Sequence, residues 1–294
     1  MPELPEIETI RMQLRKVLPG KIINKIEVLK PKSFQGKKEL VEGKRVVGVK
    51  RLAKVLLIDL EGDIDIAIHF KMTGQLVWVP DDNFQHLKKR VVGGHPTADF
   101  VGTLPSKHTR VVLHMDSGTL YFNDQRIFGW VKAGTKEEIA NMKFLKELGP
   151  EPMNISEEEF IKLISKRKKP VKLVLMDQTE ISGVGNIYAN DACWEAKVNP
   201  RRLANSLTRR QYQDLYRGVI KVLEEGIKYG GATAADAKYI DLHGLGGHYQ
   251  EHFRVYDREG EECRRPACRQ AGGGIIHRLA LGGRGTYFCP KCQI

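Results

Sequence analysis

Residues 263–292 read CRRPACRQAGGGIIHRLALGGRGTYFCPKC, and the cysteines in this stretch decide how the C-terminal part of the chain folds. The second pair has the C-x2-C spacing that lets two thiolates reach one ion, and the first pair is the looser C-x4-C. Twenty residues separate the pairs, which is enough for a β-hairpin. Four thiolates around one tetrahedral ion are typical of a closed structural zinc site. We therefore expect one structural Zn²⁺, held by Cys263, Cys268, Cys289 and Cys292.

Zinc would also supply stability, because a module of about 40 residues has too little core to fold alone. Two alternatives stay open: four free cysteines, or His277 in place of one thiolate. The fifth cysteine, Cys193, lies on a predicted apolar helix and is interpreted as a core residue. Crowding of cysteines in a chain without a secretion signal favours metal over disulfides.

Two glycine-rich segments are candidates for phosphate binding. Arg284 lies in GGRGTYF (282–288), where a bare hairpin tip would let the arginine reach into a groove; a solvated surface arginine is the alternative. In ISGVGNIY (181–188) a Gly-x-Gly turn leads into a helix, an arrangement that binds phosphate. Asn186 either caps that helix or touches the phosphate. The basic run Lys166–Lys169 either adds to this positive surface or is simply solvated.

Helical patterns dominate the segment after Gly134. Helices are predicted over 136–148, 156–168, 170–178, from Asn186 onward, and over 208–228. Ser156 and Glu159 have capping-box spacing. Residues 230–250 are rich in glycine and are predicted to form a flexible loop.

The first 134 residues are predicted to form a β-rich domain with one leading helix, over 6–18. In 64–71, Ile64, Ile66, Ile68 and Phe70 alternate with Asp65, Ala67, His69 and Lys71, which predicts a strand with one buried face. Further strands are predicted at 45–50 and 54–60, and a hairpin at 110–124 that turns at Ser117-Gly118. Residues 80–106 have little periodicity and are interpreted as a surface insertion. The predicted fold class is α+β.

Composition limits the function classes. The chain has 294 residues, 41% hydrophobic and 29% charged, which suits about two globular domains and excludes disordered, collagen-like and coiled-coil proteins. Its apolar runs are too short to cross a bilayer, and the acidic start lacks a signal segment, so we expect a cytoplasmic protein. The net charge of +12 indicates a polyanion partner, most often nucleic acid.

The N-terminus itself is a candidate reagent. Proline at position 2 permits removal of the initiator methionine, which would leave the secondary amine of Pro2 as the chain start. A peptide α-amine has a pKa of about 7.7–8.0, far below that of lysine, so part of it is unprotonated at neutral pH. Such an amine attacks an aldehyde-level carbon to form an iminium ion, and Glu3 and Glu6 supply carboxylates for proton transfer. Judged on composition alone, an inert N-terminus is the commoner case.

Taken together, these motifs resemble the formamidopyrimidine-DNA glycosylase family of bifunctional DNA glycosylases. The resemblance runs from end to end through MPELPEIETIR (1–11), HFKMTGQL (69–76), NDQRIFG (123–129), LGPEP (148–152), MDQTEISGVGNIYAND (176–191) and GGRGTYFCPKCQ (282–293). It implies an N-terminal β-sandwich catalytic domain over 1–134, a linker over 135–150, a helix–two-turns–helix domain with a lesion-facing loop over 151–250, and a zinc finger over 251–294.

The resemblance also implies the activity: excision of 8-oxoguanine and formamidopyrimidines from damaged double-stranded DNA, followed by lyase cleavage at the abasic site. Pro2 would form a Schiff base that leads to β,δ-elimination, assisted by Glu3, Glu6 and Lys54, with Lys54 on phosphate next to the lesion. Met72, Arg126 and Phe128 would fill the void left by the extruded base, and Asn186 and Arg284 would clamp phosphates. The protein would act as a monomer on the bacterial nucleoid, without a membrane partner. By their residue types alone, Met72 and Phe128 are more typical of core packing.

Several departures from the family pattern keep alternatives open. The first zinc pair is C-x4-C instead of C-x2-C. The family usually has a glutamate two residues after the GNIY motif, whereas here Ala189, Asn190 and Asp191 follow it. The segment 80–106 is longer than usual. GGATAADA (230–237) lacks the arginine of the family's lesion-facing loop. An endonuclease VIII-like enzyme for oxidised pyrimidines is therefore one alternative, and a non-catalytic protein that binds damaged DNA is another.

Overall fold

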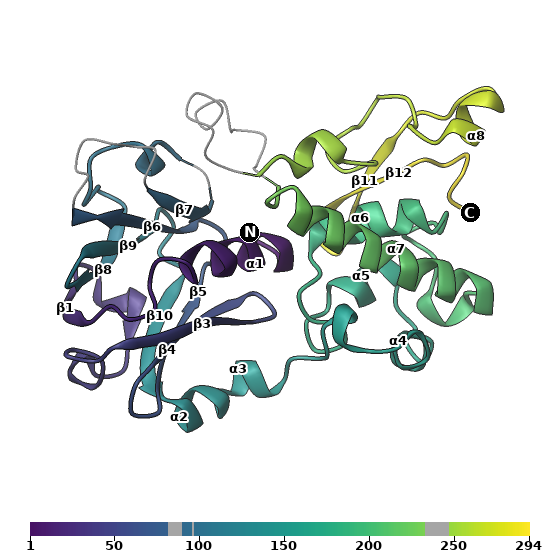
Figure 1. The fold of residues 1–294 in the computed structure, drawn as a ribbon. Helices are drawn as coiled ribbons and strands as arrows, with labels where there is room; N and C mark the ends of the chain where they lie inside the picture. The colour runs from purple at the N-terminus through teal and green to yellow at the C-terminus, as the bar shows by residue number, and fades with distance from the viewer. Residues whose placement is uncertain (82–89, 96, 233–246) are drawn as a thin grey trace. The chain divides into compact units, whose positions relative to one another are not determined.

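The computed structural model describes residues 1–81, 90–95, 97–232 and 247–294. The chain forms two compact units, Met1–Lys146 with Tyr229–Gln250, and Glu147–Lys228 with Glu251–Ile294. Figure 1 shows strands gathered in the first unit and helices with one terminal hairpin in the second. The predicted α+β class is confirmed.

The first unit is a sandwich of two five-stranded sheets. One sheet has the order β1-β8-β9-β6-β7 and the other β2-β10-β5-β4-β3, with every pair antiparallel except β10 and β2. Aliphatic and aromatic side chains of both sheets and of helix α1 form one buried core, as in other packed sheets. The strands are β1 (Ile23–Val28), β2 (Phe34–Gln35), β3 (Val46–Leu52), β4 (Val55–Leu60), β5 (Ile64–His69), β6 (Gly74–Pro80), β7 (Val91–Gly94), β8 (Thr109–Met115), β9 (Gly118–Asp124) and β10 (Trp130–Thr135).

Helix α1 spans Leu4–Leu14, which corrects the predicted range 6–18 at both ends. It begins early because the Glu6 carboxylate accepts a hydrogen bond from the Glu3 backbone N–H at 2.7 Å and so satisfies the first turn. Beyond Arg15 the chain continues in turns as far as Leu18, the residue before Pro19, where helical geometry is disfavoured. The apolar face over Ile7, Ile10 and Leu14 is buried as predicted.

Strand β5 is buried on both faces, so the predicted exposed face is wrong. It lies between β10 and β4 in its sheet. Short helices α2 (Lys136–Ala140) and α3 (Lys143–Lys146) follow β10; α2 packs on β5, and Phe144 of α3 contacts His69. These two helices replace the single helix predicted over 136–148. Apolar and polar residues do alternate along β5, but α2 and α3 cover the face of the strand that carries the polar residues.

Residues 80–106 are more than a surface insertion. They supply edge strand β7, which pairs with β6. Val101 and Leu104 pack on a second apolar cluster formed by Val77, Val79, Val112 and Tyr121 on the first sheet. The insertion therefore covers a sheet surface that would otherwise be exposed. Residues 82–89 and 96 lie outside the described residues, and so does the part of the predicted flexible loop over 233–246.

The second unit is built from helices α4 (Glu157–Ile164), α5 (Val171–Met176), α6 (Asn186–Glu195), α7 (Arg209–Lys228) and α8 (Pro266–Gln270), with the hairpin β11 (His277–Leu281) and β12 (Arg284–Phe288). The predicted Ser156–Glu159 capping box is present at the start of α4. Short 3-10 turns occupy Pro31–Ser33, Lys38–Leu40, Ala98–Phe100, Pro152–Asn154, Ala204–Ser206 and Tyr249–His252. Among the helices of the described ranges, none combines the length and the apolar composition needed to cross a bilayer.

Candidate functional site

The three N-terminal candidate residues, Pro2, Glu3 and Glu6, lie together at the start of α1. Pro2 is buried behind an exposed Met1, and Glu3 and Glu6 are nearly inaccessible to solvent. One Glu6 oxygen accepts the Glu3 N–H at 2.7 Å and the other accepts the Ala232 N–H at 2.7 Å. Glu6 thus joins the chain start to the segment that precedes residue 233. Gly231 is required there, because it has a φ of +84° and a Cβ would lie 2.8 Å from the Glu6 Cγ.

Lys54 lies in the turn between β3 and β4 and is only 4% exposed. Arg51 shapes this turn by donating to the Ala53 carbonyl at 3.0 Å, and Arg51 in turn donates to Glu8 of α1 at 2.9 Å. Burial opposes ionisation of Glu8, but hydrogen bonds from Arg11 and Arg51 outweigh it and lower the pKa of Glu8. The charge network fixes the lysine turn to α1.

Two neighbouring loops present Met72, Arg126 and Phe128, which we call the void-filling residues after the role that the family resemblance implies. Met72 lies between β5 and β6, and the other two lie between β9 and β10. Phe128 is 53% exposed, and the Arg126 guanidinium lies 4.8 Å from the centre of its ring. Met72 is partly exposed. The core-packing interpretation is therefore wrong for Phe128, and it stays open for the partly buried Met72.

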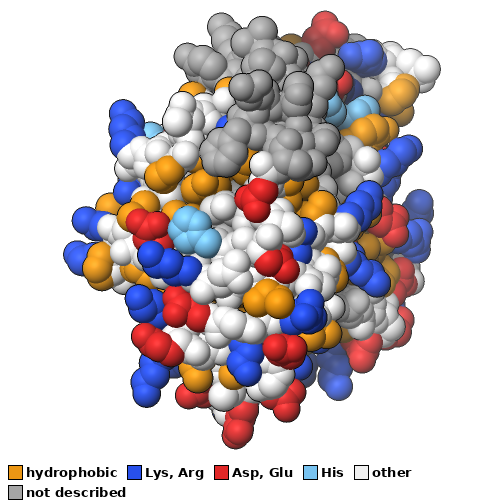
Figure 2. All heavy atoms as spheres, turned by 60° about the vertical axis from the view of Figure 1, so that its left-hand side comes forward, with side chains coloured by type: hydrophobic (Ala, Val, Ile, Leu, Met, Phe, Trp, Pro, Cys, Tyr) orange, Lys and Arg blue, Asp and Glu red, His pale blue; other side chains and the backbone are white. Residues whose placement is uncertain are grey.

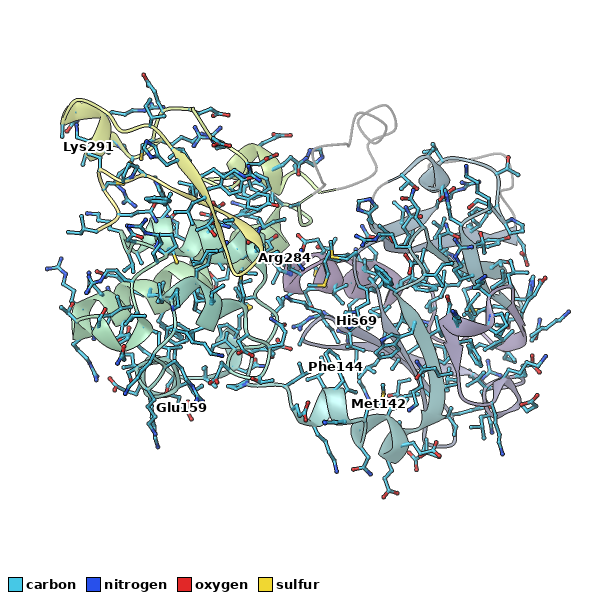
Figure 3. All side chains as sticks on the ribbon, turned by 180° about the vertical axis from the view of Figure 1, so that it is seen from behind. His69, Met142, Phe144, Glu159, Arg284 and Lys291 are labelled. Atoms are coloured by element: carbon cyan, nitrogen blue, oxygen red, sulfur yellow. The ribbon has the colours of Figure 1, made fainter. Side chains whose placement is uncertain are left out.

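His69 is a buried titratable residue near the candidate site that the sequence analysis did not single out. Burial, and then the charges of Lys71 and Lys54, lower its pKa to about 3, so the ring is neutral at pH 7. Its Nδ1 accepts the Lys71 backbone N–H at 2.9 Å, which leaves the hydrogen of the neutral ring on Nε2. Phe144 lies against the ring at 5.3 Å between centroids (Figure 3). The available signal was a histidine three residues before Met72, at the end of a strand.

The SGVGN turn of the second unit is shaped by one side chain. Gln178 accepts the Gly183 N–H at 3.0 Å and donates to the Met176 and Val184 carbonyls at 2.9 and 2.7 Å. Gly185 is the N-cap residue of α6 and Asn186 is the first helical residue. The interpretation of Asn186 as the helix cap is therefore wrong, and its side chain is not used in that role.

Arg284 is exposed at the tip of the β11–β12 hairpin, after two glycines with positive φ (Figure 3). The fully buried Lys172 of α5 donates to the Gly285 carbonyl at 2.9 Å and to the Thr286 hydroxyl at 2.7 Å. Asn190 of α6 is also fully buried. It donates to the Asn186 carbonyl at 2.6 Å and accepts the Tyr287 N–H at 2.8 Å. The structure thus links Asn186 and the Arg284 hairpin within one scaffold.

The four C-terminal cysteines converge. All four Sγ atoms lie within 4.8 Å of one another, and Cys263–Cys292 and Cys268–Cys289 are each 3.8 Å apart. Tetrahedral zinc with bonds of about 2.3 Å requires sulfur–sulfur separations of about 3.8 Å, so the cluster fits the ion. The Trp194 indole N–H donates to the Cys263 Sγ at 3.3 Å. His277 is on β11 and outside the cluster, so the alternative with a histidine ligand is wrong.

Cys193 is fully buried in α6, and burial raises its pKa to about 12. This confirms the interpretation of Cys193 as an inert core residue.

Charge alone does not mark a binding surface. In the 166–169 run, Arg167 pairs with Glu180 at 2.6 Å and Lys169 lies 3.6 Å from Asp177. On the face drawn in Figure 2, basic and acidic side chains are interspersed. The candidate site is therefore identified by the hydrogen bonds and burial of its individual residues, and not by a patch of positive charge.

Known proteins share this organisation over the whole chain. Residues 1–131 match the formamidopyrimidine-DNA glycosylase N-terminal domain, 148–238 match the H2TH domain of the same enzymes, and 273–294 match a zinc finger found in FPG and IleRS. The formamidopyrimidine-DNA glycosylase of Pelotomaculum thermopropionicum is 39% identical, with 100% of this chain and 99% of that one covered. That of Thermus thermophilus is 36% identical, with 100% and 98% covered.

Solved structures agree. The Lactococcus lactis Fpg bound to DNA that contains an abasic site has a TM-score of 0.82 at 30% identity, with 99% of each chain covered. The same protein bound to DNA that contains an oxidised pyrimidine has a TM-score of 0.81 at 30% identity and the same coverage. Both likenesses extend over the β-sandwich, the helical part and the zinc module.

Proposed function

We propose roles for individual residues, and these roles follow from the family of the chain. The chain belongs to the formamidopyrimidine-DNA glycosylase family, so it is a DNA glycosylase of base excision repair with lyase activity at abasic sites. The substrate class is double-stranded DNA that carries oxidised purines, namely 8-oxoguanine and formamidopyrimidines. The observation that carries the proposal is the buried Pro2–Glu3 start, held on α1 by Glu6, in a chain that matches the family from end to end.

Pro2 is the proposed nucleophile. Removal of Met1 converts its amide nitrogen into a secondary amine, which attacks C1′ of the damaged nucleotide. The bond from C1′ to the base breaks, and the base leaves with the bonding electrons and a proton. Glu3 protonates the ring oxygen as the sugar opens to the iminium ion. The iminium acidifies the C2′ hydrogen, so β-elimination and then δ-elimination release the two flanking phosphates.

Glu6 has a different part in this proposal. Both of its oxygens accept backbone N–H groups, from Glu3 and from Ala232. It therefore fixes the position of Glu3 and of the segment before residue 233, and Glu3 remains the proton donor.

The remaining candidates bind DNA. Lys54, Asn186 and Arg284 contact phosphates, and the void-filling residues occupy the space left when the damaged base rotates out of the helix. Unstacking a base costs a few kcal/mol, and inserted side chains offset part of that cost. The proposal also includes the domain limits: the catalytic domain over 1–134, the linker over 135–150, the helix–two-turns–helix domain over 151–250 and the zinc finger over 251–294. The protein is proposed to act as a monomer and to associate with the bacterial nucleoid.

The zinc ion is structural. The four cysteines would complete a tetrahedral shell around the ion and would leave no open position for a substrate or water. Bound zinc would stabilise the hairpin that carries Arg284.

Oxidised pyrimidines are a second candidate substrate class, because the Lactococcus lactis Fpg, with a similar fold, has been solved with DNA that contains one. Cleavage rates on matched duplexes with 8-oxoguanine or thymine glycol would rank the two classes. Faster cleavage of thymine glycol would favour the endonuclease VIII-like alternative.

Borohydride reduction tests the proposed chemistry. It should trap a covalent complex between the wild-type protein and an 8-oxoguanine duplex. Pro2→Gly should abolish trapping while binding to abasic-site DNA survives. Trapping that persists in this variant would show a different nucleophile, and no trapping by the wild type would favour a non-catalytic DNA-binding protein.

A further inference from the structure

We propose that Asp124 and Thr73 form a hydrogen-bonded pair that holds the three void-filling residues in one preformed arrangement, which makes both of them positioning residues for opening the duplex. The inference rests on the proposed function, because that function assigns Met72, Arg126 and Phe128 to the void. Neither Asp124 nor Thr73 contacts the reacting atoms in this proposal.

Asp124 organises the loop after β9 from its last residue. It is fully buried. Its Oδ2 accepts the backbone N–H groups of Phe128 at 2.8 Å and Gly129 at 2.7 Å, and its Oδ1 accepts that of Arg126 at 3.2 Å. One carboxylate therefore binds the backbone of both void-filling residues in this loop.

Between these two residues the backbone is strained. Ile127 has a φ of +58°, a conformation that β-branched residues rarely adopt. Hydrogen bonds from the flanking residues to Asp124 maintain this conformation, because releasing them would let Ile127 relax to a negative φ. The strained residue places Arg126 and Phe128 side by side, with the guanidinium 4.8 Å from the ring centre. The stacked pair therefore depends on the buried carboxylate.

Thr73 connects this loop to the one that carries Met72. Its hydroxyl donates to the Asp124 Oδ1 and accepts the Arg126 N–H at 3.0 Å. Thr73 directly follows Met72, and Gly74 and Asp124 are partners in the β6–β9 ladder. One hydroxyl thus joins the Met72 turn to the Arg126–Phe128 loop.

Close packing limits how far either loop can adjust. A Cβ at Gly74 would lie 2.4 Å from the Phe70 carbonyl oxygen, and one at Gly129 would lie 2.8 Å from the Phe122 ring. Each loop therefore ends at a glycine packed too closely for a side chain, while Arg126 and Phe128 are exposed and Met72 is partly exposed. Such preformed geometry lowers the ordering cost when the side chains enter DNA.

The pair has a chemical signature that can be tested. Thr73→Val removes the hydroxyl at nearly constant volume, and Thr73→Ser restores it. Thr119→Val, on the strand that carries Asp124, is the matched control. We expect Thr73→Val to slow single-turnover excision of 8-oxoguanine from a duplex about tenfold. Thr73→Ser should recover most of this loss, and Thr119→Val should match the wild type.

Two further measurements separate positioning from general stability. Trapping on a single-stranded abasic oligonucleotide needs no duplex opening, so Thr73→Val should leave it unchanged. In the Phe128→Ala background, Thr73→Val should add clearly less than the tenfold loss it causes alone, because one of the three residues that the pair positions is already gone. Equal losses on both substrates, or a full tenfold loss added to Phe128→Ala, would overturn the inference.

The outcomes also separate this inference from the proposed function. If Phe128→Ala leaves duplex excision unchanged, the assignment of the void-filling residues is wrong. If Phe128→Ala impairs excision and Thr73→Val does not, the assignment stands and the Asp124–Thr73 pair has no positioning role. Asp124→Asn gives an independent check, since it places an N–H₂ or a weaker acceptor against backbone N–H groups and should reproduce the substrate-selective loss.

Discussion

The side-chain oxygen of Asn190 accepts a hydrogen bond of 2.8 Å from the backbone N–H of Tyr287, three residues beyond Arg284. The amide nitrogen of the same side chain donates to the Asn186 carbonyl at 2.6 Å. One buried asparagine thus connects the first turn of α6 to strand β12. The two proposed phosphate contacts therefore have this buried side chain in common.

Removing this support should affect both contacts together. Asn190→Ala leaves the Tyr287 N–H without its acceptor, which weakens the fixed position of the hairpin. We expect affinity for abasic-site duplex DNA to fall about three- to tenfold, measured by fluorescence anisotropy at fixed salt. Asn205→Ala, at an exposed position of the same unit, is the control. Unchanged binding by Asn190→Ala would show that the two contacts are held independently.

Lys172 provides a second support for the hairpin. Lys172→Met keeps most of the volume and removes the donor to Gly285 and Thr286. The unpaired acceptors should lower the free energy of unfolding by about 1–3 kcal/mol, measured by urea denaturation. Lys168→Met, at an exposed neighbouring position, should change it little. A Lys172→Met protein as stable as the wild type would argue against a structural role for the buried lysine.

Zinc removal should disorganise the hairpin without unfolding the β-sandwich. Chelation removes the ion that would join the four thiolates, and the apolar cluster around them is small. Trp194 reports this directly, because its indole donates to Cys263 and its ring lies 4.1 Å from the Arg265 guanidinium. Chelator should change tryptophan fluorescence and abolish DNA binding, and added Zn²⁺ should restore both. Binding that survives complete removal of zinc would contradict the proposed role of Arg284.

His69 predicts a specific pH dependence of stability. In the unfolded chain a histidine takes up a proton near pH 6.5, whereas burial holds the pKa of the folded residue at about 3. The unfolded state therefore binds more protons between these values, and stability falls as the pH is lowered through this window. The contribution approaches about 1.4 kcal/mol per pH unit.

His69→Asn should remove this component, so the stability of the variant should depend less on pH between 6 and 4. Urea denaturation at several pH values measures the difference. Parallel curves for the two proteins would mean that His69 is protonated in the folded state near its ordinary pKa.

Local patterns predicted the parts of this protein that local chemistry determines. The cysteine spacing predicted the metal cluster, the Ser156–Glu159 spacing predicted a capped helix, and Ser117-Gly118 predicted a hairpin. Arg284 was predicted at a glycine tip and is found there.

Features that depend on distant packing were missed. The polar side of β5 looked exposed because the sequence does not show that α2 and α3 cover it, and His69 was overlooked for the same reason. The buried partners Asp124, Lys172 and Asn190 have polar side chains that a sequence pattern assigns to the surface. Their roles become visible only when the residues that they bind, up to 114 positions away, are in place.

Locating the atom that attacks the sugar would decide whether Pro2 is the nucleophile. The wild-type protein would be trapped with borohydride on an 8-oxoguanine duplex, digested, and mapped by mass spectrometry. We expect a DNA-derived adduct on the N-terminal peptide, at Pro2, with Met1 absent. An adduct on a lysine, such as Lys54, or a trapped protein that retains Met1, would contradict this expectation.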